Sequence, residues 1–272
     1  MNESPTPDLL SVAEFYNNIV ALELLMGENL HLGYWSQGPD AWLPEAQDRL
    51  TDLVSVSARA GAGMRVLDVG CGTGAPARRV ARTTGAHVTG VTISSVQAAT
   101  AGARSLAANM ADRTTFLTGD AMDLPLADAS YDAAFAIESL VHMSDKSRAV
   151  HEVLRVLRPG GRFVIADVVL LPSQKVVGVD AGDVATFQLL DLQTADKYKD
   201  LVRDAGFTVE EVRDCADQTR PTYARCVQRI QQNRSQLVAA AGAERTLALS
   251  NLMALFARTR QLGYIMLVAV KN

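Results

Sequence analysis

The segment Val66-Leu67-Asp68-Val69-Gly70-Cys71-Gly72-Thr73-Gly74 decides the fold. It opens with a short, mostly apolar run that is typical of a buried strand. Three glycines at alternate positions follow, and glycine lets a backbone approach a ligand in dihedral angles that a side chain forbids. Pro76 comes next, and proline is favoured in a first helical turn. The segment therefore predicts a strand, a glycine-rich ligand loop and a helix in direct succession.

Similar strands follow outward from this segment, with helical patterns between them. The predicted core strands are residues 65–69, 87–93, 114–118, 132–137 and 162–169. Strands that alternate with helices are typical of a parallel sheet with helices on both faces. Ser94 and Gln97 have the spacing of a capping box ahead of a helix that runs through Ala108. A second helix carries apolar residues at helical spacing, namely Val150, Val153, Leu154 and Leu157, and Pro159-Gly160-Gly161 ends it.

Two regions flank this core, which spans residues 61–171. Residues 1–60 are predicted to be helical and to close the ligand site. Residues 172–272 are predicted to form a helical lid and the final strands, at 207–213 and 264–270. Amphipathic helices are expected around Tyr223–Ile230 and Leu249–Phe256. We expect one α/β domain with a seven-stranded, mostly parallel sheet.

The overall composition is that of an ordinary globular protein. The chain has 272 residues, 26 Lys plus Arg and 30 Asp plus Glu, which gives a formal net charge of −4. An acidic balance offers no footprint for a nucleic-acid backbone, so we expect no nucleic-acid partner. Cys71, Cys215 and Cys226 share no short spacing, and no cluster of ligands predicts a metal site. The N-terminus does not resemble a secretory signal, and no apolar run approaches the ~20 residues of a membrane span, so we expect a cytoplasmic protein.

A glycine-rich turn after a strand is also found in NAD-binding proteins, but two details argue against NAD. The pattern is Gly-x-Gly-x-Gly rather than Gly-x-Gly-x-x-Gly. The second strand ends in Val91-Thr92-Ile93-Ser94, with no acid to bind a ribose diol. Asp68 lies inside the first strand, where it could order the loop amides or reach the ammonium group of a ligand.

The segment from Asp68 to Gly74 resembles motif I of class I S-adenosylmethionine-dependent methyltransferases. Five further segments, at residues 31–35, 90–97, 119–125, 138–143 and 154–161, resemble the same family over most of the chain. The similarity is greatest to bacterial natural-product sugar O-methyltransferases and tocopherol-type C-methyltransferases. It implies a Rossmann-like fold and S-adenosylmethionine as cofactor, with S-adenosylhomocysteine as product.

The resemblance also implies a role for each matched residue. The loop glycines would let backbone amides approach the methionine part, residues after the second strand would lie beside ribose and adenine, and Glu138 would lie near the methionine end. The implied cofactor-binding residues are Asp68, Gly70, Gly72, Gly74, Ile93, Ser94, Gln97, Asp120, Ala121, Met122 and Glu138. Some have structural alternatives: Gln97 could serve only the capping box, Asp120 could cap its loop, and Met122 could belong to the core.

His142 is the candidate general base, because it follows the fourth strand at the edge of the sheet where ligands bind in such folds. Asp167, at the end of the fifth strand, could orient it or stabilise its charge. The alternatives are a surface histidine and a turn-capping aspartate. The related sugar O-methyltransferases tend to carry two adjacent histidines, whereas this chain has Val141-His142. That departure slightly favours an aromatic carbon over oxygen as the acceptor atom.

The expected activity is methyl transfer to a carbon or oxygen of a small aromatic or glycosylated natural product. Phenol-like and indole acceptors are included. The alternative is an S-adenosylmethionine-binding enzyme that catalyses a reaction such as cyclisation. Tyr16, Tyr34 and Trp35 are expected to close the substrate pocket from the N-terminal side, although Trp35 could equally pack among the N-terminal helices. The oligomeric state is expected to be a monomer or a homodimer.

Overall fold

The structure is a computed structural model, and it describes residues 19–36, 42–171, 192–258, 260 and 262–272. Among these residues a seven-stranded sheet has the order β3-β2-β1-β4-β5-β7-β6, with β7 antiparallel to both of its neighbours. The other pairs are parallel. The strands are β1 (Arg65–Val69), β2 (His87–Thr92), β3 (Thr114–Thr118), β4 (Tyr131–Ile137), β5 (Leu157–Leu170), β6 (Phe207–Asp214) and β7 (Leu262–Lys271). This is the expected Rossmann-like α/β architecture.

The predicted strands are present, and their ends agree closely except in β5. Helix α6 (Lys146–Val156) stops before Leu157, which pairs with Tyr131 as the first residue of β5. The helix was predicted to include Leu157. Pro159 disfavours helical dihedral angles in Arg158 and cannot donate to a helix, so the helix could gain little beyond Val156, and Leu157 is already extended with a ψ of 144°.

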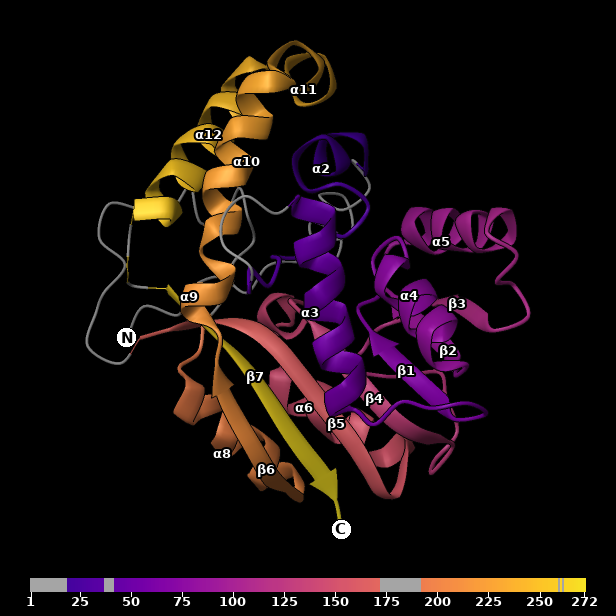
Figure 1. The fold of residues 1–272 in the computed structure, drawn as a ribbon. Helices are drawn as coiled ribbons and strands as arrows, with labels where there is room; N and C mark the ends of the chain where they lie inside the picture. The colour runs from indigo at the N-terminus through magenta and orange to yellow at the C-terminus, as the bar shows by residue number, and fades with distance from the viewer. Residues whose placement is uncertain (1–18, 37–41, 172–191, 259, 261) are drawn as a thin grey trace.

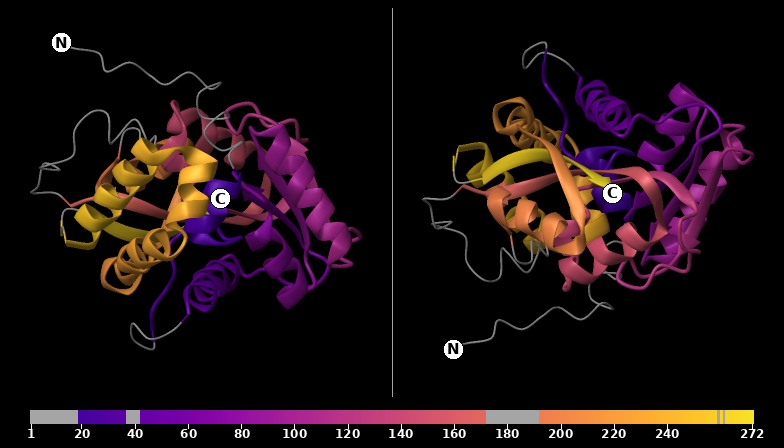
Figure 2. Two further views of the ribbon diagram at one scale, coloured as in Figure 1. Left: turned by 90° about the horizontal axis from the view of Figure 1, so that it is seen from above. Right: turned by 90° about the horizontal axis from the view of Figure 1, so that it is seen from below.

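Helices cover both faces of the sheet (Figure 2). On one face, α3 (Leu43–Ser57) and α4 (Ala75–Thr84) pack into a core that includes Val66 and Phe135. On the other face, α6 and α8 (Ala195–Ala205) pack into a core that includes Leu67 and Ile165. Helix α5 (Ser95–Ala107) contacts β2 and β3. Alternate residues of the central strands therefore belong to different cores, as expected for strands that are buried on both sides.

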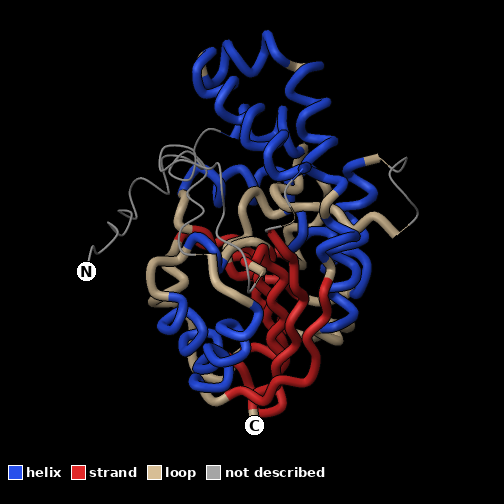
Figure 3. The backbone as a smooth tube through the Cα atoms, turned by 90° about the vertical axis from the view of Figure 1, so that its left-hand side faces the viewer, coloured by secondary structure: helices blue, strands red, loops and turns tan. Residues whose placement is uncertain are grey.

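A helical cap lies beyond the carboxyl ends of the parallel strands (Figures 1 and 3). It contains α2 (Ile19–Met26), α10 (Pro221–Gln232), α11 (Arg234–Ala241) and α12 (Ala243–Arg258), and the short α9 (Ala216–Thr219) leads into it from β6. Helices α10 and α11 contact α2, which joins the N-terminal and C-terminal additions. This confirms the amphipathic helices expected at 223–230 and 249–256. The division of the chain at residues 60 and 171 stays a prediction.

Candidate functional site

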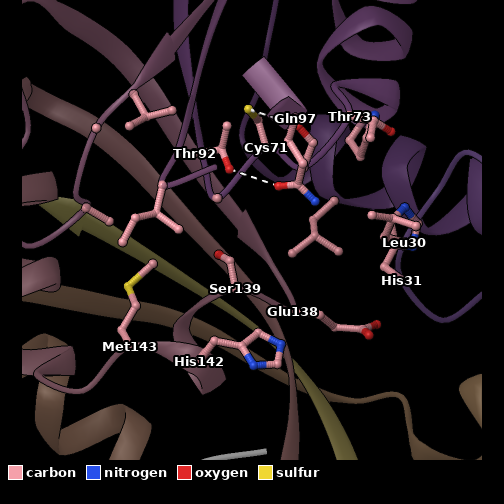
Figure 4. A pocket seen from close by; sticks show the side chains of 18 of the residues that line it. Leu30, His31, Cys71, Thr73, Thr92, Gln97, Glu138, Ser139, His142 and Met143 are labelled. Carbon is pink, nitrogen blue, oxygen red and sulfur yellow. Dashed lines mark hydrogen bonds between the residues drawn. The ribbon is translucent and has the colours of Figure 1, made fainter. Parts of the chain in front are cut away.

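A cavity opens at the carboxyl ends of β1, β2, β3 and β4, and the empty space in it and in its open mouth is about 930 Å³. The loops after these four strands and a segment before α3 supply its walls (Figure 4). Nine of the predicted site residues line it: Gly70, Gly72, Ile93, Gln97, Asp120, Ala121, Met122, Glu138 and His142. Residues from five distant parts of the sequence thus meet at the sheet edge where ligands bind in such folds.

Each of the three loop positions requires glycine for a different structural reason. Each has a positive φ, which glycine adopts most readily. At Gly70 a Cβ would lie 2.4 Å from Cβ of Ser139, and at Gly74 it would lie 2.6 Å from the ring of Phe116. At Gly72 the nearest atom would be Cδ1 of Leu30, at 3.7 Å, so a side chain there would project into the cavity. Gly72 keeps the cavity open, whereas Gly74 allows close packing and does not line it.

Thr92, Ile93 and Gln97 form the wall after β2. Ser94 caps α5 by accepting the backbone N–H of Gln97 at 3.1 Å, and it does not line the cavity. The Gln97 side chain does not complete the capping box in return: its Oε1 accepts the Thr92 hydroxyl at 2.9 Å (Figure 4). Its Nε2 is buried and has no hydrogen-bond partner among the described residues. This amide is therefore an available donor at the cavity wall.

The loop after β3 contributes Asp120, Ala121 and Met122. Oδ1 of Asp120 accepts the backbone N–H of Met122 at 2.9 Å, so the carboxylate does cap its own loop. Because Asp120 and Met122 also line the cavity, the structural alternative and the binding role are compatible. Asp68 is different: it is buried, does not line the cavity, and its Oδ2 has no partner in the described part of the chain. Burial raises its pKa.

Glu138 follows β4 directly and has a φ of 48°, which is unusual for a residue with a side chain. Its Oε1 accepts both the backbone N–H of Leu32, at 2.8 Å, and the hydroxyl of Tyr264, at 3.0 Å. Burial raises its pKa to about 8 despite these two hydrogen bonds. At neutral pH the carboxyl is therefore mainly protonated, although it lines the cavity.

His142 ends the short 3₁₀ helix η1 (Leu140–His142) and lines the cavity beside Met143 (Figure 4). Asp167 lies behind this turn rather than in the cavity wall. It accepts the backbone N–H of Val141 at 3.0 Å and that of Val168 at 2.9 Å. The structure thus brings Asp167 to the turn that carries His142, where the Asp167 carboxylate binds backbone amides rather than the imidazole.

Residues 27–32, called here the N-terminal segment, form a wall that the sequence analysis did not assign. Glu28, Leu30 and His31 line the cavity. The Thr73 hydroxyl donates to the Glu28 carbonyl at 3.2 Å, and Arg78 pairs with the Glu28 carboxylate at 3.0 Å. His31 is buried and its pKa falls to about 4, so the ring is neutral. The only sequence signal was the resemblance at residues 31–35, which directed attention to the aromatic residues instead.

The expectation that Tyr34 and Trp35 line the substrate pocket does not match the described cavity. Trp35 is buried with Leu43 and Ala46, and its Nε1 donates to the Thr222 hydroxyl at 2.8 Å. Tyr34 packs against the core formed by α3 and α4. The structural alternative weighed for Trp35 is therefore the one that the geometry favours. Tyr16 lies outside the described residues.

Comparison with known proteins decides the family. Residues 67–165 match the methyltransferase domain family. The chain is 37% identical to 27-O-demethylrifamycin SV methyltransferase of Amycolatopsis mediterranei over 98% of both chains. It is 40% identical to methyltransferase GfsG of Streptomyces halstedii over 78% of this chain and 77% of that one.

The chain belongs to the S-adenosylmethionine-dependent methyltransferases. The structure of the [4+2]-cyclase SpnF superimposes on this methyltransferase with a TM-score of 0.87 and 32% identity, over 100% of this chain and 99% of that one. The cyclopropane synthase MmaA2 of Mycobacterium tuberculosis shares the fold, with a TM-score of 0.85 and 20% identity over 99% of this chain and 100% of that one.

The cavity of this methyltransferase fits the cofactor of its family. The open space above Gly72 admits a ligand close to the loop, and the unpartnered Nε2 of Gln97 offers a donor to ribose or adenine acceptors. No described helix is long and apolar enough to cross a membrane. Within the same residues, no group of three or more His, Cys, Asp and Glu side chains could hold a metal ion.

Proposed function

We propose that this methyltransferase methylates a hydroxyl oxygen of a bulky small molecule of secondary metabolism, with His142 as the general base. The observation that carries the proposal is the position of the imidazole, in the same cavity as the glycine loop and Gln97. A base in this place can take the proton of a hydroxyl as its oxygen attacks.

Each part of the site has a task. The cofactor, when bound, supplies an activated methyl group on a sulfonium ion. Gly70, Gly72, Ile93, Gln97 and the 120–122 loop would hold it, as the family resemblance implies. Leu30, Ile137 and Met143 are apolar parts of the cavity wall. Fixing the acceptor near the reacting carbon can lower the barrier by ~7–11 kcal/mol.

The names of the relatives favour oxygen over carbon as the acceptor atom. The rifamycin enzyme is named for a 27-O-demethyl substrate, and a relative from Herpetosiphon aurantiacus, 35% identical over 86% of this chain and 83% of that one, is a (+)-O-methylkolavelool synthase. The single histidine had slightly favoured an aromatic carbon. We place a hydroxyl group first because relatives matched along most of this chain carry that chemistry in their names.

An acceptor screen tests the proposal. Phenols, indoles, glycosides and polycyclic or macrocyclic alcohols are incubated with cofactor that carries a ¹³C-labelled methyl group. We expect labelled methyl ethers from at least one alcohol or phenol, together with S-adenosylhomocysteine. Methylation at a ring carbon instead would contradict the choice of oxygen.

The variant His142→Ala tests the base. We expect kcat to fall by about 10²–10⁴-fold, the usual contribution of general base catalysis. The affinity for S-adenosylhomocysteine, measured by calorimetry, should stay close to that of the wild type, because other residues hold the cofactor. Equal turnover in the two proteins would remove His142 from the mechanism.

A cyclase that uses the cofactor only as a scaffold is the second candidate. It is favoured by the likeness to SpnF along the whole chain. Such an enzyme would convert its substrate without a change in mass and would form no S-adenosylhomocysteine. Product mass and cofactor consumption in the same assay therefore separate the two functions.

A further inference from the structure

Asp167 is a carboxylate in an otherwise apolar layer. Its neighbours on the same face of β5, Ile165 and Val169, belong to the core beneath α6 and α8. Asp167 itself is 0% exposed. A buried carboxylate is costly unless hydrogen bonds satisfy it, so its partners indicate why the position holds an acid.

Oδ2 of Asp167 accepts hydrogen bonds from two elements, η1 and α8, that also share the core beneath α6. It accepts the backbone N–H of Val141 in the η1 turn at 3.0 Å and the hydroxyl of Tyr198 on α8 at 2.9 Å. Tyr198 is also 0% exposed. A chain of hydrogen bonds therefore runs from α8, through β5, to the residue next to His142.

We propose that Tyr198 is a positioning residue, which fixes the η1 turn through Asp167 and so directs the His142 imidazole into the cavity. The hydroxyl holds the carboxylate in the orientation that accepts the Val141 amide. Since Val141 and His142 are consecutive in a short 3₁₀ turn, a shift of the amide moves the imidazole. Catalytic side chains need this support, because small misplacements have large effects on rate.

The effect of Tyr198 on Asp167 should also be measurable as a change in the pKa of the carboxyl group. Several groups influence the pKa of Asp167 or of the nearby Glu138. Tyr198 on α8 and Lys146 on α6 lower the pKa of Asp167, and Tyr264 on β7 lowers that of Glu138, which Asp167 raises. Burial raises the pKa of Asp167 to about 7, and the Tyr198 hydroxyl is the largest influence that lowers it. Removal of that hydroxyl should raise the pKa further, so that Asp167 loses its charge near neutral pH.

The test compares Tyr198→Phe with Tyr131→Phe. Tyr131 is also buried, but it begins the central strand β4, at the end opposite to the carboxyl ends that line the cavity. We expect Tyr198→Phe to lower kcat by about tenfold or more, as loss of a hydrogen bond to a charged group implies. The KM and the cofactor affinity should change little, and the acidic limb of the kcat profile should move to higher pH. Tyr131→Phe should leave kcat and this limb unchanged.

A double-mutant cycle tests whether Tyr198 acts through Asp167. In an Asp167→Asn background, Tyr198→Phe should have little further effect on kcat, because the carboxylate that it holds is already gone. Additive losses, or a Tyr198→Phe enzyme that matches the wild type in kcat and pH profile, would overturn the proposal.

A readout without an acceptor keeps this inference distinct from the proposed function, on which its catalytic part rests. The exchange of the Val141 amide hydrogen in cofactor-free protein should be faster in Tyr198→Phe and unchanged in Tyr131→Phe. If the exchange accelerates but His142→Ala keeps full activity, the proposed base is wrong and the support of the turn stands. Unchanged exchange contradicts the support itself.

Discussion

The hydroxyl of Tyr264 donates a hydrogen bond of 3.0 Å to Oε1 of Glu138, from the last strand of the sheet to the residue that follows β4. The same oxygen accepts the backbone N–H of Leu32. One carboxyl group therefore ties the middle of the sheet to a late strand and to the N-terminal segment that lines the cavity. Its ionisation should influence both stability and the shape of the site.

The first prediction concerns pH. The pKa of Glu138 rises from an ordinary 4.5 to about 8 in the folded protein, so between these values the folded state keeps a proton that the unfolded chain has released. The free energy of unfolding should therefore be highest at the acidic end and fall as pH rises through about 8. Glu138→Gln carries no such proton, and its free energy of unfolding should fall less.

Urea unfolding of the cofactor-free protein at several pH values between about 5.5 and 8.5 measures this difference. The raised pKa of Asp167 contributes in the same direction in both proteins, so only the difference between them reports on Glu138. Parallel curves for the wild type and Glu138→Gln would contradict the prediction.

The second prediction separates two glycines of one loop. Gly72→Val places its side chain in the cavity, so calorimetry should detect no S-adenosylhomocysteine binding while the far-ultraviolet circular dichroism stays that of a folded protein. Gly74→Ala drives a methyl group into the Phe116 ring, so it should lower the melting temperature more than Gly72→Ala does, because both alanines take a positive φ but only the one at position 74 lacks space. Normal binding by Gly72→Val would show that the loop does not face the cofactor.

The third prediction concerns Gln47, whose buried Nε2 shares its two hydrogens among the carbonyls of Met26, Asn29 and His31, at 3.0, 2.7 and 2.7 Å. Gln47→Ala leaves these carbonyls without that donor, so the free energy of unfolding should fall by about 1–3 kcal/mol. Cofactor affinity should also fall, because His31 belongs to the cavity wall.

The matched control is Glu45→Ala on the same helix. Glu45 is exposed, and its 3.6 Å ion pair with the partly buried Arg49 should contribute less than ~1 kcal/mol. The interpretation fails if Gln47→Ala binds the cofactor as tightly as Glu45→Ala does.

The fourth prediction tests the position of Trp35. Trp35→Phe removes the hydrogen bond to Thr222, so the free energy of unfolding should fall by about 1 kcal/mol in urea titrations. The KM for the acceptor should stay that of the wild type, because Trp35 lies outside the described cavity wall. An increased KM would restore the pocket role expected from the sequence.

Local signals in the sequence were sufficient for the fold. Short continuous apolar runs located the strands, and the glycines after β1 located the ligand loop. His142 lines the cavity as expected from its place after a strand of a parallel sheet and from the family resemblance, and Gln97 lines it as the resemblance implied.

The contacts that escaped prediction join residues far apart in the chain. The bond between Leu32 and Glu138 spans 106 positions, and that between Tyr198 and Asp167 spans 31. Sequence patterns describe residues that lie a few positions apart. They therefore could not predict the cavity wall formed by residues 27–32 or the support of the η1 turn by Asp167. Trp35 was predicted to lie at the pocket because it is an aromatic residue near a motif. A distant residue, Thr222, accepts its hydrogen bond and fixes its position outside the described cavity wall.

The order of the strands in the sheet also limits when the sheet can be completed during synthesis. Strand β7 is synthesised after the other described strands, yet it lies between β5 and β6 and is the only described partner strand of β6. A nascent or truncated chain that stops before Leu262 exposes the edge of β5 and leaves β6 unpaired. Unpaired edges promote aggregation, so premature termination near the C-terminus should yield insoluble protein rather than a weakened enzyme.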